Sequence, residues 1–238
     1  MTNRELKNKV SKGKTLGIIS YLIIALCLTP LFSNRVNVDP ISHIQNTVVR
    51  ITCKVPETTF SFMGIPLVTT PAQTVTGSGV IINKEGLVVT NAHVMEGCAG
   101  GDITVDIKDS VTTGEWVAED VDKDLALLQL SKGEYEFASF GMQPHVGDTV
   151  YAQGSPLGIR SMLTKGVIGS NVTNGKTKIF LSDVKILPGN SGGGLFNTFG
   201  NLVGINEAII VSENGNISVT IQGEEVEEFI NDYLKSVN

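Results

Sequence analysis

The chain has 238 residues, 41% of them hydrophobic, which is enough for one two-lobed globular domain with a short appendage. Its formal net charge of −6 is unevenly distributed, because residues from 36 onward hold 12 Lys and Arg against 23 Asp and Glu. So acidic a domain argues against nucleic acid as a partner, since phosphate backbones attract basic surfaces.

An uncharged apolar segment over residues 16–32 follows a basic segment over residues 1–15. Its length of about 17 residues is at the short limit for a helix that spans a bilayer. Five basic residues precede it and only Arg35 follows closely, so the positive-inside rule places the N-terminus in the cytoplasm. The sequence therefore predicts an uncleaved transmembrane signal anchor, a tether over residues 33–40, and the rest of the chain on the extracytoplasmic side. A cleaved signal peptide is the rival interpretation, although no small-x-small cleavage site follows the apolar run.

Beyond the tether, runs of β-branched and apolar residues alternate with turn residues, which predicts an all-β domain over residues 41–222. The runs fall into two groups, expected as two six-stranded antiparallel barrels at about residues 41–131 and 145–222. The first group is 48–53, 77–82, 87–90, 103–107, 115–119 and 125–130. The second group is 150–153, 165–170, 178–182, 193–196, 202–208 and 217–221.

One loop and two helical segments complete the predicted domain. The prolines and threonines of residues 54–74 predict a loop, whose bulky apolar side chains are expected to pack within the same lobe. These are Phe60, Phe62 and Met63. Residues 92–96 are expected to form a single helical turn, and residues 223–238 a C-terminal helix that packs on the second barrel. The apolar residues at helical spacing in the C-terminal helix are Val226, Phe229, Ile230, Tyr233 and Leu234.

The chain has three cysteines, of which Cys27 lies in the apolar segment. Cys53 and Cys98 form one disulfide if the domain lies in an oxidising compartment, and two free thiols are the alternative. No spacing of cysteine and histidine suggests a zinc site, so neither a metal nor a cofactor is expected.

Three residues supply the parts of a serine-hydrolase triad, in the chain order His93, Asp124 and Ser191. A serine hydroxyl is a weak nucleophile until a base removes its proton, so His93 is predicted to take that proton and later give it to the leaving amine. Asp124 is predicted to hold the imidazole tautomer and to stabilise the imidazolium. Asp122 is its only close rival, and Asp124 is favoured because it directly precedes the apolar run 125–130.

Glycines surround the predicted nucleophile, and they allow the backbone to aim N–H groups at one point. Gly189, Asn190 and Ser191 are therefore predicted to form the oxyanion hole, with the N–H groups of the first and the last as its donors.

The order of the triad discriminates between unrelated folds. Residues 189–193 also fit the Gly-x-Ser-x-Gly nucleophile elbow of α/β-hydrolases, which needs its histidine after the serine. All three histidines of the chain precede Ser191, so that fold is excluded. The subtilisin order needs an aspartate before the histidine, and only Glu85 lies shortly before His93. The order therefore predicts the chymotrypsin-type double barrel.

With these motifs the chain resembles the HtrA/Deg branch of the trypsin-like serine proteases. The matching stretches follow the family order between residues 77 and 208. They are 77–82, 87–94, 124–128, 146–148, 154–158, 188–193 and 204–206. The chain departs from the family at residues 155–158, which read Ser-Pro-Leu-Gly where the family often has Asn-Pro-Phe-Gly. It is also expected to lack the PDZ domain that many members carry after the protease.

The resemblance implies that residues 41–222 are a serine endopeptidase domain acting on protein or peptide substrates, in protein quality control or regulated proteolysis. It also implies a homotrimer as the assembly, since the family often forms trimers. Members can hold the oxyanion loop inactive, so a protease-fold binding or chaperone-like module with a dormant triad is the second interpretation. The resemblance further implies a shallow apolar substrate pocket for small or medium aliphatic side chains, and an acidic preference is the alternative if the Lys185 ammonium reaches the pocket floor. The expected residues of the pocket are Ile186 on one wall and Ile205, Asn206, Glu207 and Ala208 on the other.

Overall fold

The computed structural model describes residues 39–156, 159, 161–212 and 215–237. The predicted basic segment, transmembrane anchor and nearly all of the predicted tether lie outside these residues. Among the helices that are described, none is both long enough and apolar enough to cross a bilayer.

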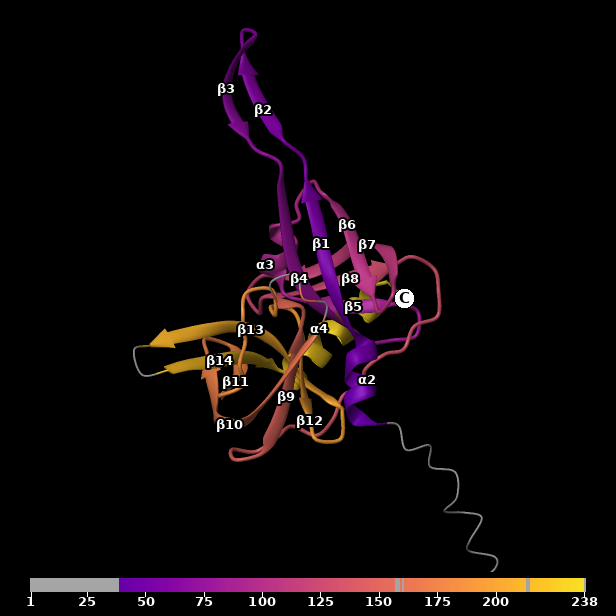
Figure 1. The fold of residues 1–238 in the computed structure, drawn as a ribbon, viewed down its shortest axis with the longest axis vertical. Helices are drawn as coiled ribbons and strands as arrows, with labels where there is room; N and C mark the ends of the chain where they lie inside the picture. The colour runs from indigo at the N-terminus through magenta and orange to yellow at the C-terminus, as the bar shows by residue number, and fades with distance from the viewer. Residues whose placement is uncertain (1–38, 157–158, 160, 213–214, 238) are drawn as a thin grey trace, which may run out of the picture. The chain divides into compact units, whose positions relative to one another are not determined.

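Six antiparallel strands of the first half of the domain close into a barrel. Figure 1 labels these strands. They are β1 (Val48–Val55), β4 (Gln73–Ile81), β5 (Leu87–Thr90), β6 (Asp102–Ile107), β7 (Ser110–Asp120) and β8 (Leu125–Leu130). The strands are ordered β1-β4-β5-β8-β7-β6 around the barrel. Residues on β5 and on most of β8 are buried, as expected of strands that read as continuous apolar runs.

The second half of the domain forms a second closed barrel of six strands. They are β9 (Thr149–Gly154), β10 (Met162–Asn174), β11 (Thr177–Ser182), β12 (Gly194–Asn197), β13 (Leu202–Ser212) and β14 (Gly215–Gln222). Their order around the barrel is β10-β11-β14-β13-β12-β9. The predicted all-β fold with two six-stranded antiparallel barrels is therefore confirmed.

A shared apolar core joins the two barrels, and the C-terminal helix α4 (Gly223–Ser236) belongs to it. The predicted C-terminal helix is thus present, and it packs against β8 of the first barrel as well as against β13 and β14. Burial of each large apolar side chain stabilises the fold by about 1.5–3 kcal/mol. The core includes Leu87, Val89, Leu125 and Leu127 from the first barrel, Phe196, Leu202, Ile205 and Ile221 from the second, and Val226, Phe229 and Ile230 from α4.

The loop prediction over residues 54–74 is wrong, because this segment contains a hairpin of β2 (Thr58–Phe62) and β3 (Ile65–Thr70). The hairpin projects from the first barrel in Figure 1. Its bulky side chains do not pack within the lobe: Phe60, Phe62 and Met63 are 64%, 61% and 86% exposed. Prolines had suggested a loop, but a two-stranded ribbon has only edge strands, and edge strands tolerate proline.

The end of the predicted tether overlaps a helix that the sequence analysis missed, α2 (Pro40–Thr47). The Asp39 side chain accepts a hydrogen bond of 3.2 Å from the N–H of Ile41, and Pro40 occupies the first turn. An N-cap aspartate followed by proline is an ordinary helix start, since proline loses no helical hydrogen bond there. Ile44 of this helix is buried in the shared core.

Cys53 and Cys98 form a disulfide, with 5.3 Å between their Cα atoms, so the disulfide alternative is the correct one. The bond joins β1 to the residues that follow α3 (Ala92–Glu96), the helical turn that carries His93. It thereby ties the end of the segment that carries His93 to β1.

We expect reduction of this disulfide to lower the free energy of unfolding by about 4 kcal/mol, because a cross-link across 45 residues removes much of the unfolded chain's entropy. Urea unfolding with and without a reductant measures the difference. The Cys53→Ala/Cys98→Ala variant is the control, since its unfolding midpoint should not respond to the reductant. Equal midpoints for the oxidised and reduced wild type would contradict the prediction.

Candidate active site

The three predicted triad residues come from both barrels. His93 lies on α3 and Asp124 in the turn between β7 and β8, both in the first barrel, whereas Ser191 lies in the turn before β12 of the second. The His93 side chain is 47% exposed and the Asp124 side chain 23% exposed, so the pair is open to solvent on one side.

The structure joins Asp124 and His93 by two hydrogen bonds. Asp124 Oδ2 lies 2.8 Å from His93 Nδ1, and Asp124 Oδ1 accepts the backbone N–H of His93 at 2.9 Å. The carbonyl of Asp124 accepts a third bond, of 2.9 Å, from the Asn91 side chain. Because the Asp124 carboxylate can only accept a hydrogen bond from the ring, it orients the imidazole and favours the tautomer with the proton on Nδ1. The rival Asp122 is exposed and makes neither bond.

The environment raises the pKa of His93 above its ordinary value. The hydrogen bond to Asp124 is the largest cause, burial opposes it, and the negative charges of Asp124, Glu207 and Glu96 add to it. A carboxylate beside an imidazole stabilises its protonated form, which is the form that a general base reaches after taking a proton.

Ser191 is not hydrogen-bonded to the histidine in this structure. Its Oγ donates to the carbonyl of Glu207 at 3.1 Å, and within the described residues no hydrogen bond joins it to His93. Rotation about χ1 carries a serine hydroxyl between three staggered positions, so one rotamer change separates this state from other orientations of the Oγ.

The predicted oxyanion loop depends on glycine at two positions. Gly189 and Gly192 have φ angles of +99° and +82°, which other residues rarely adopt. A Cβ on Gly192 would also lie 2.2 Å from the carbonyl oxygen of Ser78. The N–H of Asn190 is used in the turn, where it donates to the carbonyl of Leu187 at 2.9 Å.

The N–H groups of Gly189 and Ser191 make no hydrogen bond to any described residue. The assignment of these two N–H groups to an oxyanion hole stays a prediction.

Ser78 of β4 is a residue of this site to which the sequence analysis gave no role. It is fully buried, donates from Oγ to the carbonyl of Gly189 at 2.6 Å, and accepts from the N–H of Ser155 at 2.9 Å. Its own N–H donates to the carbonyl of Ser191 at 2.8 Å. Ser78 of the first barrel is thus hydrogen-bonded to two residues of the predicted oxyanion loop, Gly189 and Ser191, in the second half of the domain. The sequence feature that could have drawn attention to Ser78 is its position between two glycines, directly before apolar strand residues.

We expect Ser78→Ala to slow the labelling of Ser191 by a serine-reactive phosphonate by about 10- to 100-fold, because displacement of the loop by about 1 Å is enough for such a loss. The control is Ser182→Ala, since the Ser182 hydroxyl is also buried but has no hydrogen-bond partner among the described residues. Unchanged labelling of Ser78→Ala would show that the loop keeps its shape without this hydroxyl.

The residues predicted to bind substrate divide into buried and accessible ones. Ile205 and Asn206 are fully buried, and Ile186 is 4% exposed within the core of the second barrel. Glu207 is half-buried and Ala208 is exposed, so these two present side chains at the surface. The Asn206 side chain donates from Nδ2 to the carbonyl of Gly194, and its backbone is hydrogen-bonded to Gly192 and Gly193.

Glu207 is an acidic group beside the His93–Asp124 pair. Burial is the main cause that raises the pKa of its carboxyl, the charge of Asp124 adds to it, and His93 opposes it. No group of three histidine, cysteine, aspartate or glutamate side chains within the described ranges is placed to hold a metal ion.

Two closed six-stranded barrels, with a paired histidine and aspartate on one and a serine in a glycine turn on the other, define the chymotrypsin-like class. The family described as "Trypsin-like peptidase domain" matches residues 77–205, which is more than half of the chain, and the chain belongs to this family.

The chain is similar to relatives that carry Deg- and Hho-type protease names. It is 35% identical over 156 residues to a "Probable periplasmic serine endoprotease DegP-like" of Chlamydia trachomatis, covering 61% of this chain and 30% of that protein. It is 33% identical to a "Putative serine protease HhoB" of Synechocystis sp., of which it covers 37%. The chain therefore spans about a third of the length of these relatives.

Solved structures of HtrA-type proteases are also similar to this chain. The "HtrA-type protease AlgW with decapeptide" superposes with a TM-score of 0.69 at 27% identity, covering 83% of this chain and 67% of that one. The "HtrA-type protease AlgW with tripeptide" superposes with a TM-score of 0.70 at 27% identity, covering 84% and 64%.

Proposed function

We propose that this protein is a serine endopeptidase that cleaves protein substrates through His93, Asp124 and Ser191. The observation that carries the proposal is that the Asp124 carboxylate accepts hydrogen bonds from the backbone N–H and from Nδ1 of His93, which leaves Nε2 free of a proton to act as the base. The family membership and the named relatives support the same chemistry.

In the proposed reaction, Ser191 Oγ attacks the scissile carbonyl carbon while its proton passes to His93 Nε2. The carbonyl oxygen becomes an oxyanion, which the N–H groups of Gly189 and Ser191 stabilise. His93 then gives the proton to the departing amine as the carbon–nitrogen bond breaks, leaving an acyl group on Ser191. Water, deprotonated by His93, hydrolyses the acyl-enzyme and restores the serine.

Active-site labelling combined with cleavage of casein tests this proposal. A serine-reactive phosphonate should attach to Ser191 only, as located by peptide mass spectrometry, and prior labelling should stop the cleavage. Labelling without cleavage would show that Ser191 is reactive but that the protein does not cleave casein. The absence of both in a folded protein would refute the proposal.

A dormant protease-fold binding module is the second candidate, and the hydrogen bond of Ser191 Oγ to the carbonyl of Glu207 favours it. In this candidate the serine turns to His93 only after an activating partner or peptide binds. Labelling that appears only when unfolded protein is added distinguishes it from an enzyme that is active at rest.

For the residue before the scissile bond we propose small or medium aliphatic side chains, because the family resemblance places the apolar Ile186 at that pocket. Lys185 is exposed, so its ammonium group does not need to occupy a pocket. Cleavage mapping on a peptide library tests this, and a dominant acidic preference that disappears in Lys185→Ala would contradict it.

We further propose that residues 16–32 anchor the protein in the membrane, with the protease domain on the extracytoplasmic side. The uncharged segment behind a basic flank supports the anchor, and the periplasmic relatives support the side. Membrane fractionation and mass spectrometry of the mature N-terminus test it, since a terminus between residues 28 and 40 would mean cleavage. A homotrimer is proposed from the family resemblance alone, and light scattering measures it.

A further inference from the structure

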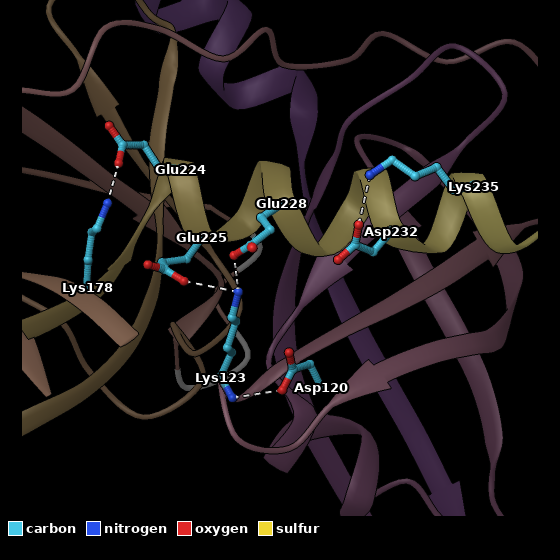
Figure 2. A network of polar contacts seen from close by, with 8 residues as sticks. All are labelled: Asp120, Lys123, Lys178, Glu224, Glu225, Glu228, Asp232 and Lys235. Carbon is cyan, nitrogen blue, oxygen red and sulfur yellow. Dashed lines mark hydrogen bonds and ion pairs between the residues drawn. The ribbon is translucent and has the colours of Figure 1, made fainter. Parts of the chain in front are cut away.

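Lys123 directly precedes Asp124 and reaches from the first barrel to the C-terminal helix, as Figure 2 shows. Its Nζ lies 3.1 Å from Glu225 Oε2 and is also hydrogen-bonded to Glu228, both in the first two turns of α4. Its backbone N–H donates to the side chain of Asp120 at 3.0 Å. Main chain and side chain of this one residue are therefore both fixed.

The ion pair is largely removed from water. The Lys123 side chain is 18% exposed and that of Glu225 only 9%, whereas Glu228 lies at the surface with 62% exposed. Burial acts against the charge on Lys123, but the hydrogen bonds to Glu228 and Glu225 outweigh it and raise its pKa, so the ammonium group stays charged. When one partner of such a pair is removed, the other is left as a buried, unpaired charge.

The contact crosses between the two halves of the candidate site. Lys123 belongs to the β7–β8 turn of the first barrel, which also carries Asp124, while α4 directly follows β14 of the second barrel. The second barrel carries Ser191. Asp124 itself has a φ of +53°, a left-handed conformation that needs support from its surroundings when the residue is not glycine.

We propose that Lys123 is a positioning residue, which uses its ion pair with Glu225 and Glu228 of α4 to hold Asp124 and His93 in place relative to Ser191. This inference rests on the proposed function, because it assigns Asp124 and His93 to the reaction. The ion pair sets the position of the β7–β8 turn, the turn sets Asp124, and the two hydrogen bonds of Asp124 set His93.

Kinetics of Lys123→Met give the first test. We expect kcat for a peptide substrate to fall by roughly 10- to 100-fold with KM nearly unchanged, since a displaced base affects the reaction and not the binding of substrate. Lys123→Arg retains the charge and the donors, so it should restore most of the kcat.

The matched control is Lys178→Met, which removes the same charge and breaks an ion pair of 2.9 Å to Glu224 on the same helix. That pair is half exposed and joins β11 of the second barrel to α4, without a hydrogen bond to the described residues of the β7–β8 turn, so its loss should leave kcat unchanged. Equal losses of kcat in Lys123→Met and Lys178→Met would overturn the inference.

NMR titration of the His93 ring gives a second readout, which does not depend on activity. If Asp124 moves away, His93 loses the hydrogen bond that raises its pKa, and the pKa should fall. Loss of the Lys123 charge alone would act in the opposite direction, because removing a cation stabilises the imidazolium. Asp124, Glu207 and Glu96 are the other charges that act on the ring.

A fall of the His93 pKa in Lys123→Met supports the inference even if the wild type hydrolyses no peptide, in which case only the proposed function fails. A rise of the His93 pKa, or no change, overturns the inference.

If Lys123→Met does not fold, Lys123→Met/Glu225→Leu replaces the buried pair by apolar groups and leaves no unpaired buried charge. This folded variant should show the same loss of kcat and the same fall of the pKa, and wild-type values would overturn the inference.

Discussion

Ser191→Ala is expected to abolish peptide-bond hydrolysis, with a loss of about 10⁶-fold in kcat. The change removes the nucleophile and one hydrogen bond to the carbonyl of Glu207, and little else. The turn around Ser191 is set by its backbone, because Gly192 donates to the carbonyl of Asn206 and Ser78 donates to the carbonyl of Ser191. The free energy of unfolding should therefore change by less than about 1 kcal/mol.

The measurement is cleavage of casein together with phosphonate labelling and urea unfolding of the same preparation. Ser182→Ala is a suitable control, because it deletes a buried hydroxyl from the same barrel, on β11, away from the turn of Ser191. Wild-type cleavage by a folded Ser191→Ala protein would remove Ser191 from the mechanism. Loss of cleavage accompanied by unfolding would show that the serine is structural.

The strands that bury both faces were the easiest part of the fold to predict. β5 and β8 read as continuous apolar runs because they face the core, and their predicted and observed bounds agree. The C-terminal helix α4 was equally easy to predict, because the face that packs in the shared core carries apolar residues at helical spacing. Patterns of this kind are local and follow from burial alone.

The β2–β3 hairpin could not be predicted in the same way, because every residue of β2 is exposed and no buried face imposes a period on this strand. Phe60 and Phe62 are both exposed, so their alternation carried no information about a core. The start of α2 was present in the sequence as Asp39 and Pro40, but the segment was assigned to the tether.

The parts of the candidate site that lay beyond prediction are the contacts between the barrels. The order of His93, Asp124 and Ser191 predicts a triad from residue types alone. Nothing local to Ser78 shows that its hydroxyl binds the carbonyl of Gly189, which is 111 residues away in the sequence. Lys123 is likewise separated from Glu228 by 105 residues. Such pairs depend on how two closed barrels meet, which no local pattern encodes.

Asp124→Asn is expected to keep the fold and to lower kcat at neutral pH by about 10⁴-fold. Asparagine tolerates the left-handed backbone that this position requires, and its carbonyl oxygen can still accept the N–H of His93. The amide nitrogen, however, would replace Oδ2 opposite His93 Nδ1. Because an amide nitrogen only donates, it favours the tautomer with the proton on Nε2, which leaves no lone pair there to take the serine proton.

The same variant has a defined effect on pH dependence. In the wild type Asp124 raises the pKa of His93, and the histidine must be neutral to act as a base, so kcat/KM should rise with pH through that raised pKa. Loss of the carboxylate lowers the pKa, so the remaining activity should show its acidic limb at lower pH. Asp122→Asn makes the same chemical change at an exposed neighbour and should alter neither kcat nor the limb. Measurement of kcat/KM from pH 5 to 9 on both variants tests the assignment. An equal loss of kcat in Asp122→Asn, or an acidic limb of Asp124→Asn at the wild-type pH, would mean that Asp124 does not control the histidine.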